Sequence, residues 1–204
     1  MKVLLINGSP NKKGCTFTAL TEIKNQLEKE GVDSEIFWIG NKPVRGCIAC
    51  SKCGHGKGKC AFDDDPANEI IDKIVESDAL IVGSPVYYAG PNGALCAILD
   101  RVFYAGSSNF AFKPAAAIVS CRRGGASASF DRLNKYFTIS NMPVVASQYW
   151  NMVHGNTPEE VKQDLEGLQT MRTLATNMAW ILKSIENNGL PKHEAEKQRT
   201  NFIR

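Results

Sequence analysis

The sequence lacks several features that would place it in a special class. No apolar run approaches the roughly 20 residues that a membrane-spanning helix needs. The turn after the first apolar run has neither the dinucleotide pattern G-x-G-x-x-G nor the lysine–serine pair of a Walker phosphate loop. Charge of one sign is also scarce, because 24 basic residues stand against 21 acidic ones. We therefore expect neither a membrane protein nor a partner of nucleic acids.

What is present is the composition of an ordinary globular protein. The 204 residues are 43% hydrophobic and 22% charged, which excludes a disordered or collagen-like chain. The first apolar run, residues 3–6, is too short for the core of a secretory signal. We expect a cytoplasmic protein with one main domain.

Short apolar runs alternate with segments of helical spacing along most of the chain. The apolar runs predict strands at 3–6, 34–39, 79–82, 115–120 and 143–146. The helical spacing predicts helices at 17–30, 66–76, 92–103, 127–137 and 157–187. This alternation is typical of a parallel sheet covered by helices on both faces. We predict a doubly wound α/β domain over residues 1–190, followed by a C-terminal tail, 191–204.

The cysteines are the least ordinary part of the composition. Four of the seven lie in an irregular insertion, residues 43–65, and we call them the clustered cysteines: Cys47, Cys50, Cys53 and Cys60. In a reducing compartment such a group indicates metal binding or redox chemistry rather than disulfides. The spacing resembles the ligand run of a [4Fe–4S] cluster more than a zinc site, whose two cysteine pairs stand farther apart. Free thiols in a flexible lid are the alternative.

The turn after the first predicted strand suits a phosphate group. It offers hydroxyls and the open amides of a helix start, where the helix dipole attracts an anion. The alternative is a polar loop with a capping threonine. The candidate residues in this turn are Ser9, Asn11, Gly14, Cys15, Thr16 and Thr18.

Two further loops follow the third and fourth predicted strands. Pro85, Val86, Tyr87 and Tyr88 combine a fixed backbone with flat aromatic faces, which suits a planar heteroaromatic ring or, alternatively, a subunit interface. Ser120, Gly124 and Gly125 belong to a glycine-rich loop that also carries two arginines. In a parallel sheet the carboxyl ends of the strands share one edge, so we expect the three loops to form one crevice.

These motifs resemble those of a known family. Two segments carry the resemblance to the flavodoxin-like NAD(P)H-dependent FMN reductases: Gly8-Ser9-Pro10 with Gly14-Cys15-Thr16, and Gly83-Ser84-Pro85-Val86-Tyr87. The resemblance implies five parallel strands in the order 2-1-3-4-5, bound FMN, and a homodimer or homotetramer. By matching position it implies that the first loop holds the phosphate and the other two hold the isoalloxazine ring. Cys15 stands where the family often has asparagine. The cysteine insertion is similar to that of the iron–sulfur flavoproteins.

We therefore predict an FMN-dependent oxidoreductase without a catalytic side chain of its own. NAD(P)H would reduce the flavin, which would pass electrons to a small acceptor such as a quinone, an azo or nitro compound, or free flavin. One alternative is a [4Fe–4S] cluster that relays single electrons from a ferredoxin-like donor to FMN. A second is a non-catalytic flavin-binding redox sensor.

Overall fold

The structure is a computed structural model, and it describes residues 1–54 and 58–191. The predicted tail, apart from Pro191, lies outside the described residues. The strands are β1 (Lys2–Asn7), β2 (Asp33–Trp38), β3 (Ala79–Tyr87), β4 (Gly90–Pro91), β5 (Ala115–Cys121) and β6 (Met152–His154). The helices are α1 (Cys15–Lys29), α2 (Ala67–Glu76), α3 (Gly93–Gly106), α4 (Ala126–Ile139), α5 (Pro158–Val161) and α6 (Leu165–Asn188), with a short 3-10 turn at Ser107–Asn109.

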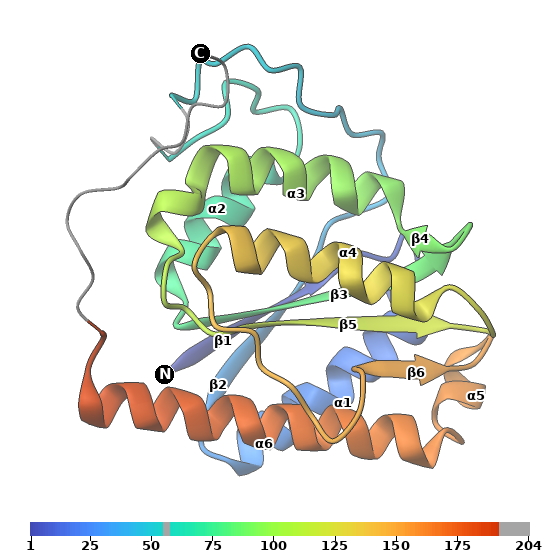
Figure 1. The fold of residues 1–204 in the computed structure, drawn as a ribbon. Coiled ribbons are helices and arrows are strands. Elements are labelled where there is room, and N and C mark those ends of the chain that lie inside the picture. Colours follow the sequence, from blue (N-terminus) through green and yellow to red (C-terminus); the bar gives the residue numbers. More distant parts are fainter. Residues whose placement is uncertain (55–57, 192–204) are drawn as a thin grey trace, which may run out of the picture.

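The main sheet runs in the order β2-β1-β3-β5-β6, and its neighbouring strands are parallel (Figure 1). The predicted order 2-1-3-4-5 is thereby confirmed, because the two-residue β4 only folds back against the end of β3. β1 lies between β2 and β3, and Leu4 of β1 pairs with Leu80 of β3. The order of the strands reverses between β1 and β3, which is where doubly wound sheets bind ligands.

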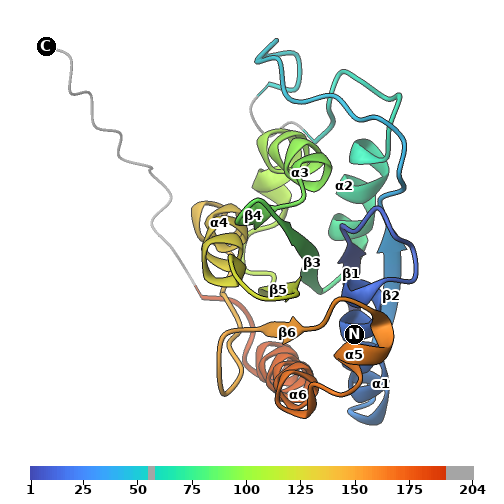
Figure 2. The ribbon, with the colours of Figure 1, turned by 90° about the vertical axis from the view of Figure 1, so that its right-hand side faces the viewer.

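Helices cover both faces of the sheet, as Figure 2 shows end on. Leu4 and Ile6 of β1 face α2, α3 and α4, whereas Val3 and Leu5 face α1 and α6. Successive strand residues point to opposite faces, so a strand buried on both sides must be apolar at every position. All four of these side chains are fully buried, and each contributes about 1.5–3 kcal/mol relative to exposure.

The fifth strand corrects the sequence prediction. At the predicted site, 143–146, only Val144 forms a bridge, beside Ala115 at the start of β5. The strand that completes the sheet is instead Met152–His154, which pairs with the other end of β5. Pro143 has no N–H to give to a ladder. The Asn151 amide then holds the returning chain through a hydrogen bond to the Ala117 carbonyl, at 3.1 Å.

The long helix predicted at 157–187 is also corrected, because the chain breaks it in two. Thr157 caps α5 by accepting from the Glu160 N–H at 3.2 Å. Asp164 then accepts from the Gly167 N–H at 2.9 Å and starts α6. An aspartate that bonds a nearby backbone amide favours a helix start over a helix interior. The predicted stop is confirmed, since Gly189 ends α6 with a φ of 74°.

The remaining helices and strands lie within a few residues of their predicted positions, except that β3 extends to Tyr87. That extension carries the strand into the loop predicted to hold a planar ring. None of the described helices has the length and hydrophobicity needed to cross a membrane.

Candidate functional site

A pocket of about 200 Å³ lies at the carboxyl edge of the sheet. The carboxyl ends of β3 and β5, the start of α1 and the loops after β1, β5 and β6 supply its lining residues: Ser9, Asn11, Cys15, Thr16, Pro85, Val86, Tyr87, Ser120, Cys121, Arg122, Gly155 and Asn156. We call it the strand-end pocket. The crevice predicted from three separate loops is therefore present, and a fourth loop contributes to it.

The turn before α1 forms one end of this pocket and is held by its own hydrogen bonds. The Ser9 N–H donates to the Asn7 side chain at 3.1 Å, and the Ser9 hydroxyl accepts from the Asn11 N–H at 3.1 Å. Trp38 of β2 donates its indole N–H to the Ser9 carbonyl at 2.8 Å. Gly14 occupies the N-cap of α1, and no side chain caps this helix. The amides of its first turn therefore remain open to an anion such as a phosphate.

Two hydroxyls join the first and third loops at the pocket. The Thr16 and Ser120 oxygens lie 2.8 Å apart, and both residues are buried. Each hydroxyl can donate once and accept twice, so this contact leaves both with hydrogen-bonding capacity for a ligand. The pairing fixes the start of α1 against the end of β5.

The proline–tyrosine loop after β3 is anchored through Asn92, the N-cap of α3. The Asn92 side chain donates to the Gly8 carbonyl at 2.7 Å, and its backbone N–H donates to the Ser84 hydroxyl at 3.0 Å. The Ser84 hydroxyl in turn donates to the Pro85 carbonyl at 2.8 Å. These hydrogen bonds connect the turn between β1 and α1 to the segment at the end of β3 that carries Pro85 and Tyr87.

Gly8 shows how closely these parts pack. A Cβ atom at this position would lie 2.4 Å from a Leu95 methyl and 2.7 Å from the Gly83 carbonyl oxygen. Its own N–H donates to that carbonyl at 2.9 Å. The first loop, β3 and α3 therefore meet at a position that only glycine fits.

Five of the predicted residues do not line the pocket. Tyr88 is fully exposed at the tip of the β3–β4 turn, and the Thr18 hydroxyl donates to the Gly14 carbonyl at 3.2 Å on the other side of the helix start. Gly125 packs against Val86 and Ala89 at the start of α4, where a φ of 89° suits glycine. Gly14 and Gly124 also lie outside the lining.

Gly155, Asn156 and Cys121 line the pocket but are not among the residues predicted from the sequence. The first two follow β6, and placing the fifth strand at 143–146 concealed that they stand at a strand end. The signal available was the apolar run before a Gly-Asn pair. Burial raises the pKa of the Cys15 and Cys121 thiols. A raised pKa disfavours the thiolate, which is the nucleophilic form of cysteine.

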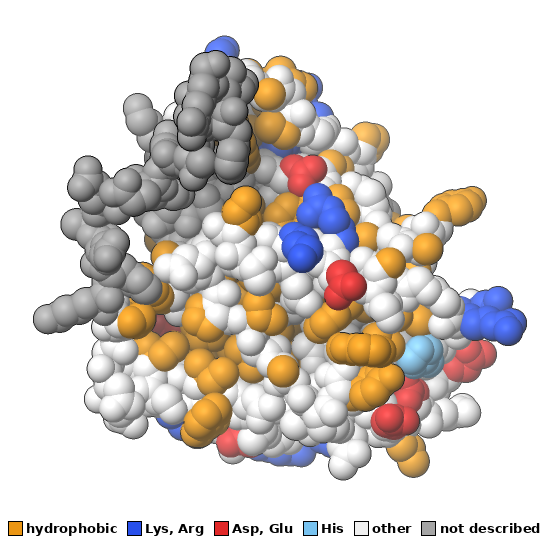
Figure 3. Space-filling model, in the orientation of Figure 1, with side chains coloured by type: hydrophobic (Ala, Val, Ile, Leu, Met, Phe, Trp, Pro, Cys, Tyr) orange, Lys and Arg blue, Asp and Glu red, His pale blue; other side chains and the backbone are white. Residues whose placement is uncertain are grey.

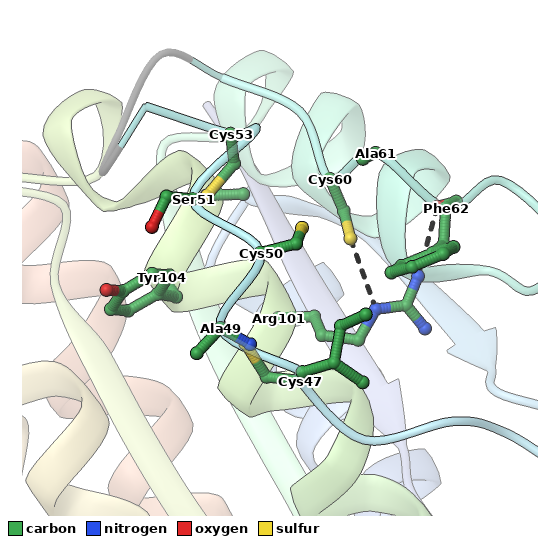
Figure 4. Close-up of a pocket in the computed structure, with 12 residues that line it drawn as sticks. Cys47, Ala49, Cys50, Ser51, Cys53, Cys60, Ala61, Phe62, Arg101 and Tyr104 are labelled. Atoms are coloured by element: carbon green, nitrogen blue, oxygen red, sulfur yellow. Dashed lines mark hydrogen bonds between the residues drawn. The ribbon is translucent and has the colours of Figure 1, made fainter.

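A second pocket, which we call the cysteine pocket, gathers all four clustered cysteines (Figure 4). Cys50 and Cys60 direct their sulfur atoms toward the same space, and all four thiols are free of disulfides. Arg101 and Tyr104 of α3 form its base. The Arg101 Nε lies 3.3 Å from the Cys60 sulfur.

The donor set of the cysteine pocket fits an iron–sulfur cluster in kind and number, since a [4Fe–4S] centre needs four thiolate ligands and four cysteines line this pocket. The pocket encloses only about 20 Å³, which is room for about one water molecule. Among the described residues, no three His, Cys, Asp or Glu side chains lie close enough to share one metal ion. The metal assignment therefore stays a prediction.

Helix α3 connects the two pockets. Its N-cap, Asn92, binds the Gly8 carbonyl beside the strand-end pocket, and Arg101 lies nine residues later in the cysteine pocket. At 1.5 Å per residue this separation is about 14 Å along the helix axis. The two pockets share no lining residue, yet one short helix positions both.

The chain matches the model of the NADPH-dependent FMN reductase family over residues 1–157. It is 32% identical over 197 residues to an iron–sulfur flavoprotein of Methanocaldococcus jannaschii, an alignment that covers 91% of this chain and 100% of that protein. The chain belongs to the NADPH-dependent FMN reductase family and groups with its iron–sulfur flavoproteins. A second iron–sulfur flavoprotein of the same organism is 28% identical over 208 residues, covering 93% of this chain and all of the relative.

Solved structures share the fold at low sequence identity. A flavodoxin from the domain Archaea superposes with a TM-score of 0.61 at 17% identity, covering 90% of this chain and 99% of that one. An NADH:FMN oxidoreductase superposes with a TM-score of 0.64 at 15% identity, covering 88% of this chain and 89% of that one. The flavodoxin-like fold is confirmed, and the family confirms FMN as the cofactor of an oxidoreductase.

Proposed function

We propose that this protein is an FMN-dependent oxidoreductase in which a [4Fe–4S] cluster, held by the four clustered cysteines, exchanges single electrons with the flavin. The observation that carries the proposal is the convergence of Cys47, Cys50, Cys53 and Cys60 on one pocket at the base of α3, the helix that also anchors the flavin loops. Two relatives that align over their whole length are named iron–sulfur flavoproteins, which supports the proposal.

In this proposal the strand-end pocket holds FMN. The open amides of α1 with Ser9, Asn11 and Thr16 bind its phosphate, and the segment Pro85–Val86–Tyr87 lines one face of the ring. FMN supplies the ability to exchange either one or two electrons. The exposed Arg122 stands at the pocket, where its positive charge favours the negative charge that a flavin gains on reduction.

The test is the iron, acid-labile sulfide and FMN content of protein purified without oxygen. We expect roughly four irons for each FMN in the wild type. Cys50→Ala should lose the iron and keep the FMN, because the cysteine pocket and the strand-end pocket share no lining residue. Cys96→Ala, which changes a partly buried thiol outside the cysteine pocket, is the matched control and should keep both. Wild-type protein with full flavin and no iron, even after reconstitution, would contradict the proposal.

Direct reduction by NADPH is the second candidate function, and the description of the family favours it. The loop at the flavin pocket leaves Tyr87 exposed, so one face remains open to a stacking nicotinamide. Anaerobic mixing with NADPH, and separately with NADH, should bleach the flavin absorbance if this candidate holds. Bleaching by a reduced ferredoxin but by neither nicotinamide would leave the electron relay as the function.

The expected homodimer or homotetramer is also a proposal, supported by one apolar surface. Figure 3 shows apolar side chains gathered over the region of α4 and α6. The exposed ones in this region include Ile139, Tyr149, Trp150 and Trp180. Surfaces of this kind mark contacts with other proteins. Light scattering should give a mass of two or four chains, and Trp180→Lys should lower it; a monomeric wild type would contradict the proposal.

A further inference from the structure

One arginine is buried where the cysteine loop meets the folded core. Arg101 of α3 is only 2% exposed, although its neighbours on the loop side, Cys47 and Cys50, are exposed. A charged side chain is almost never fully buried unless it is paired and hydrogen-bonded. The burial of Arg101 therefore requires hydrogen-bonding and charged partners in addition to packing.

The guanidinium group of Arg101 donates its hydrogen bonds to residues of the cysteine loop. It is ion-paired with Asp65, whose side chain is also buried, and it donates to the carbonyls of Phe62 at 3.0 Å and Arg45 at 3.4 Å. The remaining contact is the Nε–H, which points at the Cys60 sulfur at 3.3 Å. A planar fork of donors serves these separate acceptors together, which an ammonium group does not do.

The contact with Cys60 is chemically different from the others. A neutral thiol is a weak acceptor, whereas a thiolate accepts strongly from a charged donor. The Asp65 carboxylate already balances the Arg101 charge. A sulfur that gains negative charge would therefore find a fixed, buried donor already in place.

We propose that Arg101 is a positioning residue of the iron–sulfur site: it holds Cys60 and, through the hydrogen bond to this sulfur, raises the reduction potential of the cluster. The inference rests on the proposed function. Adding one electron makes the cluster and its thiolates one charge more negative, and a hydrogen bond to a ligand sulfur stabilises that form more than the oxidised one. No residue of the strand-end pocket takes part in this contact.

A neutral replacement of the buried pair tests this without stranding a charge. Arg101→Gln with Asp65→Asn removes both charges, so that no carboxylate is left buried alone. Arg45→Gln with Asp64→Asn is the matched control, because that pair has the same chemistry and lies on the same loop but is exposed, at 3.3 Å. Both variants are prepared without oxygen and reconstituted with iron and sulfide.

The measurement is the midpoint potential of the cluster, followed by electron paramagnetic resonance during titration with dithionite. We expect the buried-pair variant to favour the oxidised cluster about tenfold more than the wild type, a decrease of about 59 mV for one electron. The exposed-pair control and the FMN potential should not change. If the buried-pair variant does not retain iron, Arg101→Lys keeps the charge but loses the bond to the sulfur, and its potential should also fall.

The outcomes separate the two proposals. Wild-type protein that takes up no iron contradicts the proposed function and this inference with it. The inference alone is contradicted if the wild type loads iron and its cluster has the same potential as in the Arg101→Gln/Asp65→Asn variant. If that variant binds no iron, the comparison is made with Arg101→Lys, and an equal potential again contradicts only the inference. A lowered potential in the buried-pair or the lysine variant, with none in the exposed-pair control, supports the role assigned to Arg101.

Discussion

In the strand-end pocket, several loops of the sheet are bonded to one another, whereas the loop of the cysteine pocket is held by two buried polar side chains, Arg101 of α3 and Asn68 of α2. Around the first, the loops after β1 and β3 are joined by Gly8, Ser84 and Asn92 through short hydrogen bonds and close contacts. Around the second, residues 43–54 and 58–65 form no helix or strand, and Arg101 attaches the loop to α3 through bonds to Arg45, Cys60, Phe62 and Asp65. The loops of the first site are therefore held by the sheet and its helices, while the cysteine loop is attached to the helices through a few side chains.

Non-glycine residues with positive φ occur beside both pockets, since Tyr88 and Ala89 of the β3–β4 turn have values of 50° and 59°. In the cysteine loop, Ala49 and Ser51 have positive φ values of 51° and 58°, a conformation that costs side-chain-bearing residues free energy. A cluster bound by four sulfurs would contribute binding energy to the ordering of such a loop. The strand-end pocket needs no such contribution, because the sheet and its helices already hold its loops.

The largest expected effect is the difference between two glycine-to-alanine substitutions, one beside each pocket. Gly8→Ala should lower the free energy of unfolding by about 3 kcal/mol and abolish FMN retention, because the new Cβ would collide with Leu95 and the Gly83 carbonyl. Gly46→Ala, beside the first clustered cysteine, should change neither, since nothing lies within 4 Å of its Cβ position. Urea unfolding and the flavin-to-protein ratio measure both. Equal losses in the two variants would remove the contrast between the pockets.

A smaller effect should separate the two sides of the α1 start. Removing the Ser9 and Thr16 hydroxyls together, with Ser9→Ala and Thr16→Ala, should weaken FMN binding at least tenfold, because each bond to a charged phosphate contributes about 1.5–3 kcal/mol. Thr18→Ala is the control, since the Thr18 hydroxyl bonds the Gly14 carbonyl and does not line the pocket. Fluorescence titration of the apoprotein gives both affinities. A stronger loss for Thr18→Ala would place the phosphate on the other side of the helix.

The smallest effect concerns a cluster of charges that touches neither pocket. Glu35 of β2 accepts from Lys73 and Lys2, and these bonds lower its pKa below the usual 4.5. A carboxyl group whose pKa is lower in the folded state stabilises the protein at pH values above its unfolded-state pKa. This contribution is lost as the pH falls through the folded-state pKa. Glu35→Gln should therefore reduce stability at pH 7 by less than about 1 kcal/mol, because the side chain is partly exposed.

Thermal unfolding of wild type and Glu35→Gln at pH 7 and at pH 3 checks the sign. The two proteins should differ more at pH 7 than at pH 3, with unchanged FMN and iron content. A difference that grows on acidification would mean that the lysines do not stabilise the carboxylate.

The sequence alone determined the alternation of strands and helices, which follows from local periodicity. The resemblance of its motifs to a known family implied the order of the parallel sheet, and the rule that parallel strands end at one edge helped to select eight of the residues that line the strand-end pocket. Only the tertiary structure decided that β6, and not 143–146, completes the sheet, which brings Gly155 and Asn156 to the pocket. It also decided that Arg101, in a helix rich in apolar residues, faces a loop distant in sequence. Strand pairing and the burial of a charge depend on long-range contacts, and a local pattern does not contain them.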